Sequence, residues 1–507
     1  MIFVGWALSD ANSHFVTNVV DSIGSEHDLI VDLQRVRDWA EIVLMIKRHC
    51  SRVLEEFIIY NAHTCESLPL CLKREFPALK LITIFSDDEW RHDSYDRYLA
   101  LFADVCTVTD RNNIERYRSY GLQHVHYMGW KCNAALFHPI AGLEPIHDVT
   151  FIGAAYGKRI DYVRYLLRAG VPLKVFGQGW GRFHDVREHW GGVLSRLDMI
   201  RVISESRINL NFLWTSGGDR ITTVKGRTLE LAACGAFQLS NHTDDFANYG
   251  FIPDDNIAVF RDRNDLLEKI HHYLAHPRQR QDIAEKGYRH VLSQHTWPAA
   301  FDELFARFRL GELQPPTLPR FKLLVIVANG VRHDVHTDDP RLEVEIITER
   351  DCVQEFGIYH GVIRLDCSST MNNDALYMMA FGIHADKAAG VLANFYLGRH
   401  WIRFRDQAIL RKRSLARMLP QTCFMVSGGV WGRHCQTLAD PYSKIAFIEY
   451  PAFSIDLPSM RSRFLRLFFC DHGDARERIR HSWRTGQLGG MLSILADRIW
   501  QKIVLGA

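Results

Sequence analysis

Several features are missing from this 507-residue sequence, and each missing feature excludes a class of protein. No two of the 11 cysteines form a CxxC pair, so neither a zinc site nor a disulfide framework is indicated. No window of about 18 uncharged apolar residues occurs, so no membrane-spanning helix is expected. The net charge is only +2, which gives no electrostatic reason to expect nucleic acid or an anionic membrane as a partner.

The start of the chain does not have the pattern of an export signal. Acidic and polar residues interrupt the apolar run Met1–Trp6 too early for one. Together with the odd number of cysteines, this favours a reducing cytoplasm. Hydrophobic residues make up 47% and charged residues 24%, as in ordinary globular proteins, and the length predicts two or three domains.

Strand and helix patterns alternate over the first part of the chain. Helical spacing, as at Asn12–Ile23, separates most of the apolar runs. The predicted strands are Ile2–Gly5, Asp28–Val31, Phe57–Tyr60, Leu79–Phe85, Asp104–Thr109 and Val125–Met128. Continuous apolar strands alternating with helices predict a parallel sheet covered on both faces. Ligands of such sheets bind at the carboxyl ends of the strands.

Acidic residues follow one of these strands directly. The segment Ser86–Arg91 reads SDDEWR and comes straight after Leu79–Phe85. Its carboxylates could hold sugar hydroxyls, bind a metal or act as a base. Alternatively, they only favour the dipole at a helix N-terminus. Because position and residue type agree, we take Asp87 and Asp88 as the catalytic candidates.

A second alternating unit begins at Asp148. Glycines close its first two strands, Gly153 after Asp148–Ile152 and Gly177 after Val171–Phe176. Small residues at strand ends let the backbone approach phosphates, and Lys158 and Arg159 could reach the same group. Neither stretch is a complete GxGxxG, and turn glycines are the alternative explanation.

The most informative stretch is Lys225–Ser240, KGRTLELAACGAFQLS. It predicts a helix that starts beside Lys225 and Arg227, ends at Cys234-Gly235-Ala236 and leads into a strand. A helix N-terminus with two nearby cations favours a diphosphate. Glu230 lies about one turn further along, where its carboxylate could accept hydrogen bonds from a ribose. Solvated charges at a helix start are the alternative reading.

These stretches carry a family resemblance. The sequence resembles the CgeB-like (spore-maturation) glycosyltransferases, of the two-Rossmann (GT-B) type and glycosyl transferases group 1. The matching stretches, in order, are Ser86–Arg91, His147–Arg159, Val175–Trp180, Lys225–Ser240, Asp262–Ile270 and Gln294–Trp297. The match covers roughly residues 1–310. Each motif alone is weak, but the same motifs in this order and spacing are fairly specific.

The resemblance implies transfer of a sugar from a nucleotide-sugar to an unknown acceptor, which would be a polysaccharide, a protein or a lipid-linked glycan. The second half would bind the donor, and the first half, with Asp87 and Asp88, would face the acceptor. The implied donor-binding residues are Gly153, Lys158, Arg159, Gly177, Lys225, Arg227 and Glu230. Related enzymes usually retain anomeric configuration, and neither a cofactor nor a divalent metal is expected.

One departure from the family pattern keeps another reading open. Many retaining relatives carry a second glutamate about two helical turns before the one that binds ribose. Thr222 stands near that place, and the nearest upstream carboxylate is Asp219. A non-catalytic nucleotide- or sugar-binding protein of the same fold is therefore the alternative. A nucleotide-sugar epimerase fits less well, because no clear acid pair is present.

We therefore predict an α/β protein with two facing Rossmann-like domains at 1–142 and 147–312 and a C-terminal α/β domain at 321–507. Three prolines in Leu313–Arg320 indicate a linker. The last domain faintly resembles a degenerate GT-A-type transferase, because Asp366-Cys367-Ser368 lacks the second carboxylate of a metal-binding Asp-x-Asp. The basic segment Arg461–Arg480 could contact a partner or the inner face of the membrane, although packing on its own domain is the simpler expectation.

Overall fold

The computed structural model describes the chain up to residue 402, except for residues 11–14, 37, 62–67, 87, 216–217, 314–316, 336–338, 352–354, 366–368, 372–374, 387–389 and 398–399. Beyond residue 402 it describes 424–426 and 445–455. The predictions for Asp87, Asp366 and Arg461–Arg480 therefore fall outside the described residues. Among the described residues, no helix is both long and apolar enough to cross a membrane.

The first domain is built on a parallel sheet with the order β2-β1-β3-β4-β5-β6. The strands are β1 (Ile2–Gly5), β2 (Leu29–Asp32), β3 (Phe57–Asn61), β4 (Lys80–Ile84), β5 (Val105–Val108) and β6 (Val125–Tyr127). The helices around it include α1 (Asp21–Ile23), α2 (Trp39–Cys50), α3 (Leu68–Glu75), α4 (Asp88–Arg91), α5 (Arg97–Leu99) and α6 (Ile114–Ser119). The central strands β1, β3, β4 and β5 are almost wholly buried because helices cover both faces, as their continuous apolar runs predict.

The second domain contains another parallel sheet, with the order β13-β12-β9-β7-β8. Its strands are β7 (His147–Ile152), β8 (Leu173–Phe176), β9 (Ser206–Asn211), β12 (Gln238–Asn241) and β13 (Ala258–Phe260). The helices are α7 (Lys158–Arg168), α8 (Arg196–Ser204), α9 (Gly226–Ala233), α10 (Arg263–Ala275) and α11 (Pro277–Gln294). A short hairpin of β10 (Trp214–Thr215) and β11 (Gly218–Thr222) precedes α9. The predicted α/β class with parallel, Rossmann-like sheets is confirmed.

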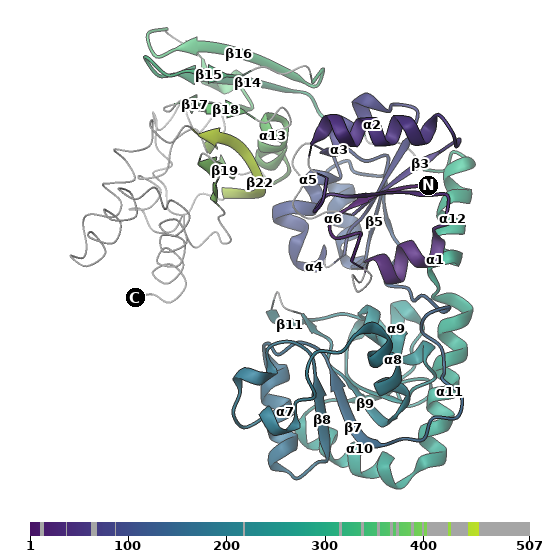
Figure 1. The fold of residues 1–507 in the computed structure, drawn as a ribbon. Helices are drawn as coiled ribbons and strands as arrows, with labels where there is room; N and C mark the ends of the chain where they lie inside the picture. Colours follow the sequence, from purple (N-terminus) through teal and green to yellow (C-terminus); the bar gives the residue numbers. More distant parts are fainter. Residues whose placement is uncertain are drawn as a thin grey trace, which may run out of the picture.

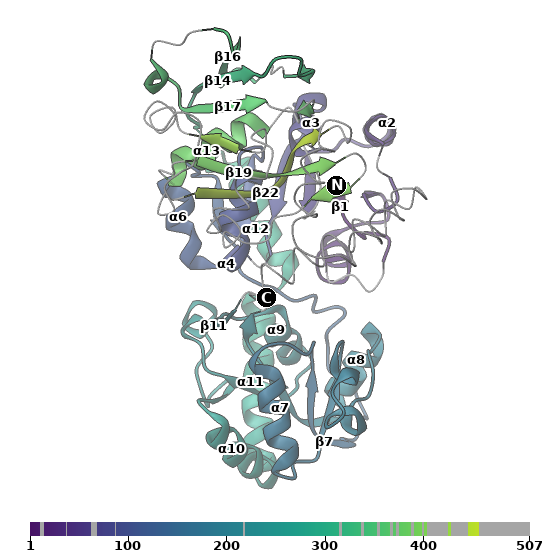
Figure 2. The same cartoon turned by 90° about the vertical axis from the view of Figure 1, so that its left-hand side faces the viewer.

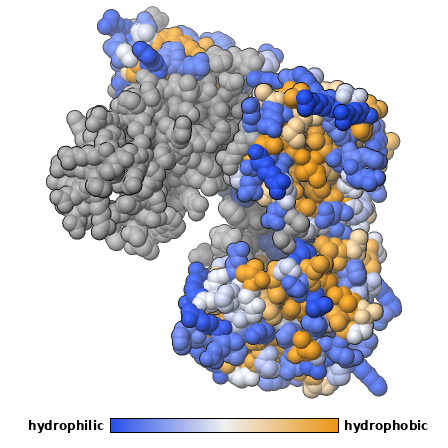
Figure 3. Space-filling model, in the orientation of Figure 1, coloured by the Kyte–Doolittle hydropathy of each residue, from blue (hydrophilic) through white to orange (hydrophobic). Residues whose placement is uncertain are grey.

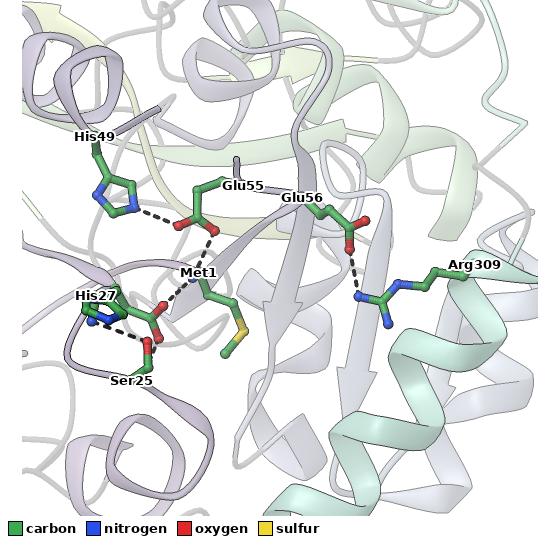
Figure 4. A network of polar contacts seen from close by, with 8 residues as sticks. Met1, Ser25, His27, His49, Glu55, Glu56 and Arg309 are labelled. Carbon is green, nitrogen blue, oxygen red and sulfur yellow. Dashed lines mark hydrogen bonds and ion pairs between the residues drawn. The ribbon is translucent and has the colours of Figure 1, made fainter. Parts of the chain in front are cut away.

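Helix α12 (Trp297–Arg309) crosses back to the first domain. Its buried residues Trp297, Phe301 and Leu304 join the core that contains strands β1, β3 and β4. Arg309 at its end forms an ion pair of 2.7 Å with Glu56, beside a polar network around the amino group of Met1 (Figure 4). Helix α12 lies within the range 147–312 predicted for the second domain, but its apolar face packs on the first domain. The domain boundaries stay a prediction.

The third domain lies against the first domain (Figures 1 and 2). Its described strands form one mixed sheet, with β14 (Phe321–Val327), β16 (Leu342–Thr348) and β17 (Gly361–Leu365) parallel to one another. The apolar helix α13 (Ala375–Asp386) packs between this sheet and the first domain. Phe381 on α13 contacts the rings of Tyr98 and Tyr120 edge-on, so the two domains share one core.

The visible surface of the first two domains mixes both kinds of residue (Figure 3). Hydrophilic residues cover α2, and an apolar area lies below it on the first domain. An apolar area on the second domain is likewise bordered by hydrophilic residues. Such mixing is ordinary for a globular protein and does not by itself mark a binding site.

Candidate donor site

The carboxyl ends of the first two sheets face each other. The backbone N–H of Trp130, which follows β6, donates to the Tyr249 hydroxyl of the second domain at 2.6 Å. The chain crosses between the domains at two neighbouring points, where Cys132 N donates to His295 O at 2.9 Å and Trp297 N donates to Cys132 O at 3.1 Å. Residues that follow the strands of both sheets are thereby brought together, as expected for a ligand site of parallel sheets.

Helix α9 carries the central residues of the site. Lys225 is its N-cap, with extended backbone and no side-chain cap, so the first N–H groups of the helix are not satisfied by a capping side chain. Gly235 ends the helix at φ +64°, and Ala236 N donates to Leu231 O at 3.1 Å. This is the glycine stop that the sequence predicts.

Arg227 and Glu230 point to the same place from successive turns of α9. Arg227 Nη1 and Glu230 Oε2 form an ion pair of 3.0 Å. The Glu230 side chain is 2% exposed and that of Arg227 is 27% exposed, so the pair has a buried end and an open end. Burial and the nearby Glu230 charge raise the pKa of Cys132 and Cys234 to about 12, so both thiols stay neutral around the site.

Arg159 lies in the first turn of α7 and is largely buried. Its Nη2 donates to Phe212 O at 2.8 Å and to Trp214 O at 3.2 Å, just beyond the carboxyl end of β9. Burial and the positive charge of Arg227 lower its pKa to about 10, so it remains charged at neutral pH. Lys158 is exposed and lies 5.9 Å from the Trp214 ring centroid. Arg159 and Arg227 are thus close enough for their positive charges to repel each other.

Gly153 and Gly177 stand where β7 and β8 end. Gly177 has φ +122°, and a Cβ there would lie 2.4 Å from Gly153 O. Only glycine fits this backbone approach, because a side chain would meet backbone that cannot move aside. Trp190 Nε1 donates to Gly177 O at 2.9 Å and Trp180 Nε1 to Gly153 O at 2.7 Å. The glycines therefore serve close packing of two loops, and their predicted contact with phosphate stays a prediction.

Lys225 lies beside a second acid. Asp245 accepts a hydrogen bond from Val224 N at 2.8 Å, and burial raises its pKa, with Lys225 acting in the opposite direction. The charge of Asp110, which follows β5 in the first domain, also raises the pKa of Asp245. The N-terminus of α9 is therefore close to the carboxyl edge of the first sheet.

Asp88 is wholly buried at the start of α4. Its Oδ1 accepts from Thr109 N at 2.8 Å, Thr109 Oγ1 at 2.8 Å and Asp110 N at 3.0 Å, and its Oδ2 accepts from Asn113 Nδ2 at 3.1 Å. Burial raises its pKa to about 6, although these hydrogen bonds act in the opposite direction. The catalytic role stays a prediction, but these bonds favour a positioning role, holding the loop after β5.

Sequence reasoning missed two residues near Glu230. Asn18 of the first domain donates to Glu230 Oε1 at 3.2 Å. Arg196 opens α8, and its pKa is lowered by burial and by Arg227, while Glu230 opposes the shift. The sequence did not indicate a role for Asn18, because a polar residue between the apolar positions of a helix is expected to face solvent. The N-cap Ser195 could have marked the first turn of α8, but not the direction of the arginine.

Thr222, which stands near the place of the second glutamate of the family, lies outside helix α9. The prediction puts residue 222 about two helical turns before Glu230. In the structure α9 begins at Gly226, and Thr222 lies on strand β11, paired with Trp214. Its backbone oxygen accepts from Thr243 Oγ1 at 2.8 Å. Thr222 is therefore not on the helix that carries Glu230.

Comparisons with known proteins found similarity over part of this chain. Residues 159–306 match the family model described as glycosyl transferase-like. The chain is 26% identical to the spore protein CgeB of Bacillus subtilis (strain 168) over 223 residues, which is 41% of this chain and 67% of that protein. Both findings rest on sequence, and the family match includes Arg159, Arg227 and Glu230.

Solved structures of similar fold include three of low sequence identity. Sucrose-phosphate synthase from Thermosynechococcus elongatus is 15% identical, with 58% of this chain and 87% of that chain covered and a TM-score of 0.41. HepE of Anabaena, in complex with UDP, is 9% identical, with coverages of 61% and 99% and a TM-score of 0.46. A glycosyltransferase from Rickettsia africae ESF-5 is 10% identical, with coverages of 61% and 98% and a TM-score of 0.43. At TM-scores this low, the likeness carries no conclusion about this chain.

The matched family segment runs from α7 into α12 and so spans the second sheet and helix α9. The relative CgeB is the namesake of the family that the sequence motifs indicate, so that resemblance is confirmed. Over these segments, the chain is similar to the CgeB-like glycosyltransferases.

Proposed function

We propose that this protein transfers a sugar from a nucleotide-sugar to an acceptor, with the donor on the second domain and the acceptor on the first. The observation that carries the proposal is the placement of Arg227 and Glu230. The two side chains pair with each other from successive turns of α9, and Glu230 contacts Asn18 of the first domain. A diphosphate bound at the open end of this pair would place its sugar between the two domains.

Positive charge and helix geometry support the diphosphate end of this site. Arg227 has one nitrogen on Glu230, which leaves further guanidinium N–H groups for phosphate oxygens. Arg159 and Arg196 lie within the electrostatic influence of Arg227. Together with Lys225 and the start of α9, these cations would stabilise the leaving diphosphate without a divalent metal. We therefore propose metal-independent transfer.

The acceptor side is proposed on the loops that follow the strands of the first sheet. Asp88 holds the backbone of Thr109 and Asp110 there, and Asp110 is close enough to the second domain to act on Asp245. The acceptor would be a polysaccharide, a protein or a lipid-linked glycan. The family resemblance supports retention of anomeric configuration, which product analysis by NMR would test.

The test is turnover of a nucleotide-sugar panel, followed as released nucleoside diphosphate. Wild-type protein is expected to turn over at least one donor, and Lys225→Ala and Glu230→Ala are each expected to lose about tenfold or more. Lys286→Ala and Glu285→Ala remove exposed charges of the same types on α11 and serve as matched controls. Undiminished turnover in both site variants would refute the assignment of this site.

The proposed metal independence has its own test. Turnover is expected to be unchanged by EDTA, because the cations that face the leaving group belong to the protein. Loss of turnover in EDTA that is restored by Mg²⁺ or Mn²⁺ would contradict this part of the proposal.

A non-catalytic nucleotide- or sugar-binding protein is the second candidate. The observation that favours it is Thr222 on β11, which stands near the place where many retaining relatives carry a second glutamate. Tight binding of a nucleoside diphosphate with no turnover of any donor would support this candidate against transfer.

A further inference from the structure

The side-chain amide of Asn18 belongs to the first domain but lies against a carboxylate of the second. Asn18 Nδ2 donates to Glu230 Oε1 at 3.2 Å, across 212 residues of sequence. Each residue is 1% exposed, so neither contacts bulk solvent. Arg227 holds the other oxygen of Glu230. The carboxylate is therefore fixed from two domains at once.

The backbone around Asn18 is also held at this interface. Val16–Val20 forms a π-helical turn that runs into α1, where Figure 1 shows the lower edge of the first domain facing α9. Such turns are rare and concentrate at functional sites. Asn133, next to the crossing point at Cys132, donates from Nδ2 to Thr17 O at 2.8 Å. The position of Asn18 is thus set by its own turn and by the crossing segment.

The other polar atom of the same amide is unused. Asn18 Oδ1 is buried and accepts no hydrogen bond from any residue in the described part of the chain. A buried carbonyl oxygen without a donor is unfavourable, and most such atoms in proteins find a partner. The same amide group that donates to Glu230 through Nδ2 therefore carries an acceptor, Oδ1, without a hydrogen-bond donor in the described part of the chain.

We propose that Asn18 is a positioning and specificity residue of the donor site, which it completes from the first domain. Its Nδ2 holds the Glu230 carboxylate in place, and its Oδ1 accepts a hydrogen bond from one hydroxyl of the ribose diol. Glu230 accepts from the neighbouring hydroxyl. The inference rests on the proposed function and adds a ribose-specific contact to it.

Because both side chains are buried, we infer that the domains separate before the nucleotide binds and close afterwards. A ribose reaches Glu230 when the two domains separate, and closing then brings Asn18 onto the diol. Two hydroxyl groups supply two donors, and Glu230 and Asn18 Oδ1 supply two acceptors in the same small volume. A 2′-deoxyribose lacks one donor and leaves one buried acceptor unfilled, so the site discriminates against it.

The experiment is calorimetric titration of the full chain with UDP, GDP and ADP, followed by the 2′-deoxy form of the tightest ligand. Asn18→Ala is expected to weaken binding about tenfold or more and to reduce the preference for ribose over deoxyribose. Asn18→Asp keeps the size but places a second carboxyl group beside Glu230, so it is expected to weaken binding further.

Asn133→Ala is the matched control, because it removes an asparagine bond to the same turn without contacting Glu230. It is expected to keep the wild-type ribose preference. Equal weakening in both alanine variants with an unchanged preference would mean a structural role only and would overturn the proposal. Wild-type or tighter binding by Asn18→Ala would also overturn it. If wild-type protein binds none of the three nucleotides, the proposed function itself fails and this inference with it.

Discussion

Two buried carboxylates, Asp88 and Glu230, differ in what surrounds them. The hydrogen bonds that the Asp88 carboxylate accepts from described residues come from Thr109, Asp110 and Asn113 of the first domain, so its oxygens hold loop structure. Glu230 instead joins a cation on its own helix and an amide on the other domain. Residue type and spacing predicted both as site residues, and among the described residues Glu230 is the one of the two that accepts a hydrogen bond from the other domain.

Asp88 makes a testable contribution to the pH dependence of stability. Its pKa of about 6 in the folded state is above the ordinary value of 3.8, so the folded state binds the proton more tightly than the unfolded state. Stability from this group is therefore highest below the unfolded pKa and is lost as pH rises from about 4 to about 6, by at most about 3 kcal/mol. Urea unfolding at pH 4.5 and 7 should show this loss, and Asp88→Asn should abolish it. An identical pH dependence in the variant would contradict the account.

Arg227 is predicted not to tolerate lysine. A planar guanidinium can hold Glu230 with one nitrogen and a phosphate with others, whereas an ammonium group is a single point. Arg227→Lys should weaken nucleoside diphosphate binding about tenfold, as measured by calorimetry. Arg289→Lys, on an exposed pair of α11, is the control and should bind as wild type. Full affinity in Arg227→Lys would show that charge alone suffices there.

The helices and strands that the sequence predicts well are those with a regular local pattern of apolar residues. The strand at Leu79–Phe85 and the helix Arg263–Ala275 have strong local patterns, and the structure contains β4 and α10 there. The glycine stop after α9 follows from local backbone rules. The π-helical turn at Val16–Val20 breaks the ordinary helical period, so the predicted helix Asn12–Ile23 did not indicate that Asn18 would be buried.

The turn after β8 depends on glycine. Gly177→Ala would place a methyl group 2.4 Å from Gly153 O at a backbone angle that alanine avoids. We expect a loss of about 1–3 kcal/mol of stability, measured by chemical unfolding. Gly170→Ala, also at positive φ but with open space around it, should lose less. Equal losses would mean that backbone angle alone matters and not the approach of the two loops.

At the scale of the whole molecule, contacts between distant segments determine which domain a helix packs on and which residues meet at the site. Local sequence patterns do not predict these contacts. The amphipathic pattern of α12 predicts an apolar face but does not say which domain it covers, and the structure packs it on the first. The Asn18–Glu230 bond joins residues that no local rule connects. The third domain gave only faint sequence signals, yet its helix α13 shares a core with the first domain.

That shared core predicts coupled stability of the first and third domains. Phe381→Ala removes a buried ring between Tyr98 and Tyr120 and should cost about 3–5 kcal/mol, whereas Phe381→Leu should cost less. Chemical unfolding should show the loss in the same transition that unfolds the first domain. A destabilised third domain beside an unchanged first domain would contradict a shared core.

The central claim is that a nucleoside diphosphate rests on the start of α9, with Glu230 at its ribose. Hydrogen–deuterium exchange of the full chain, with and without UDP, GDP or ADP, tests this most directly. A nucleotide that binds is predicted to slow exchange at the backbone amides of residues 226–230 and in the Asn18 turn. Protection confined to other regions, with residues 226–230 unchanged, would contradict the account.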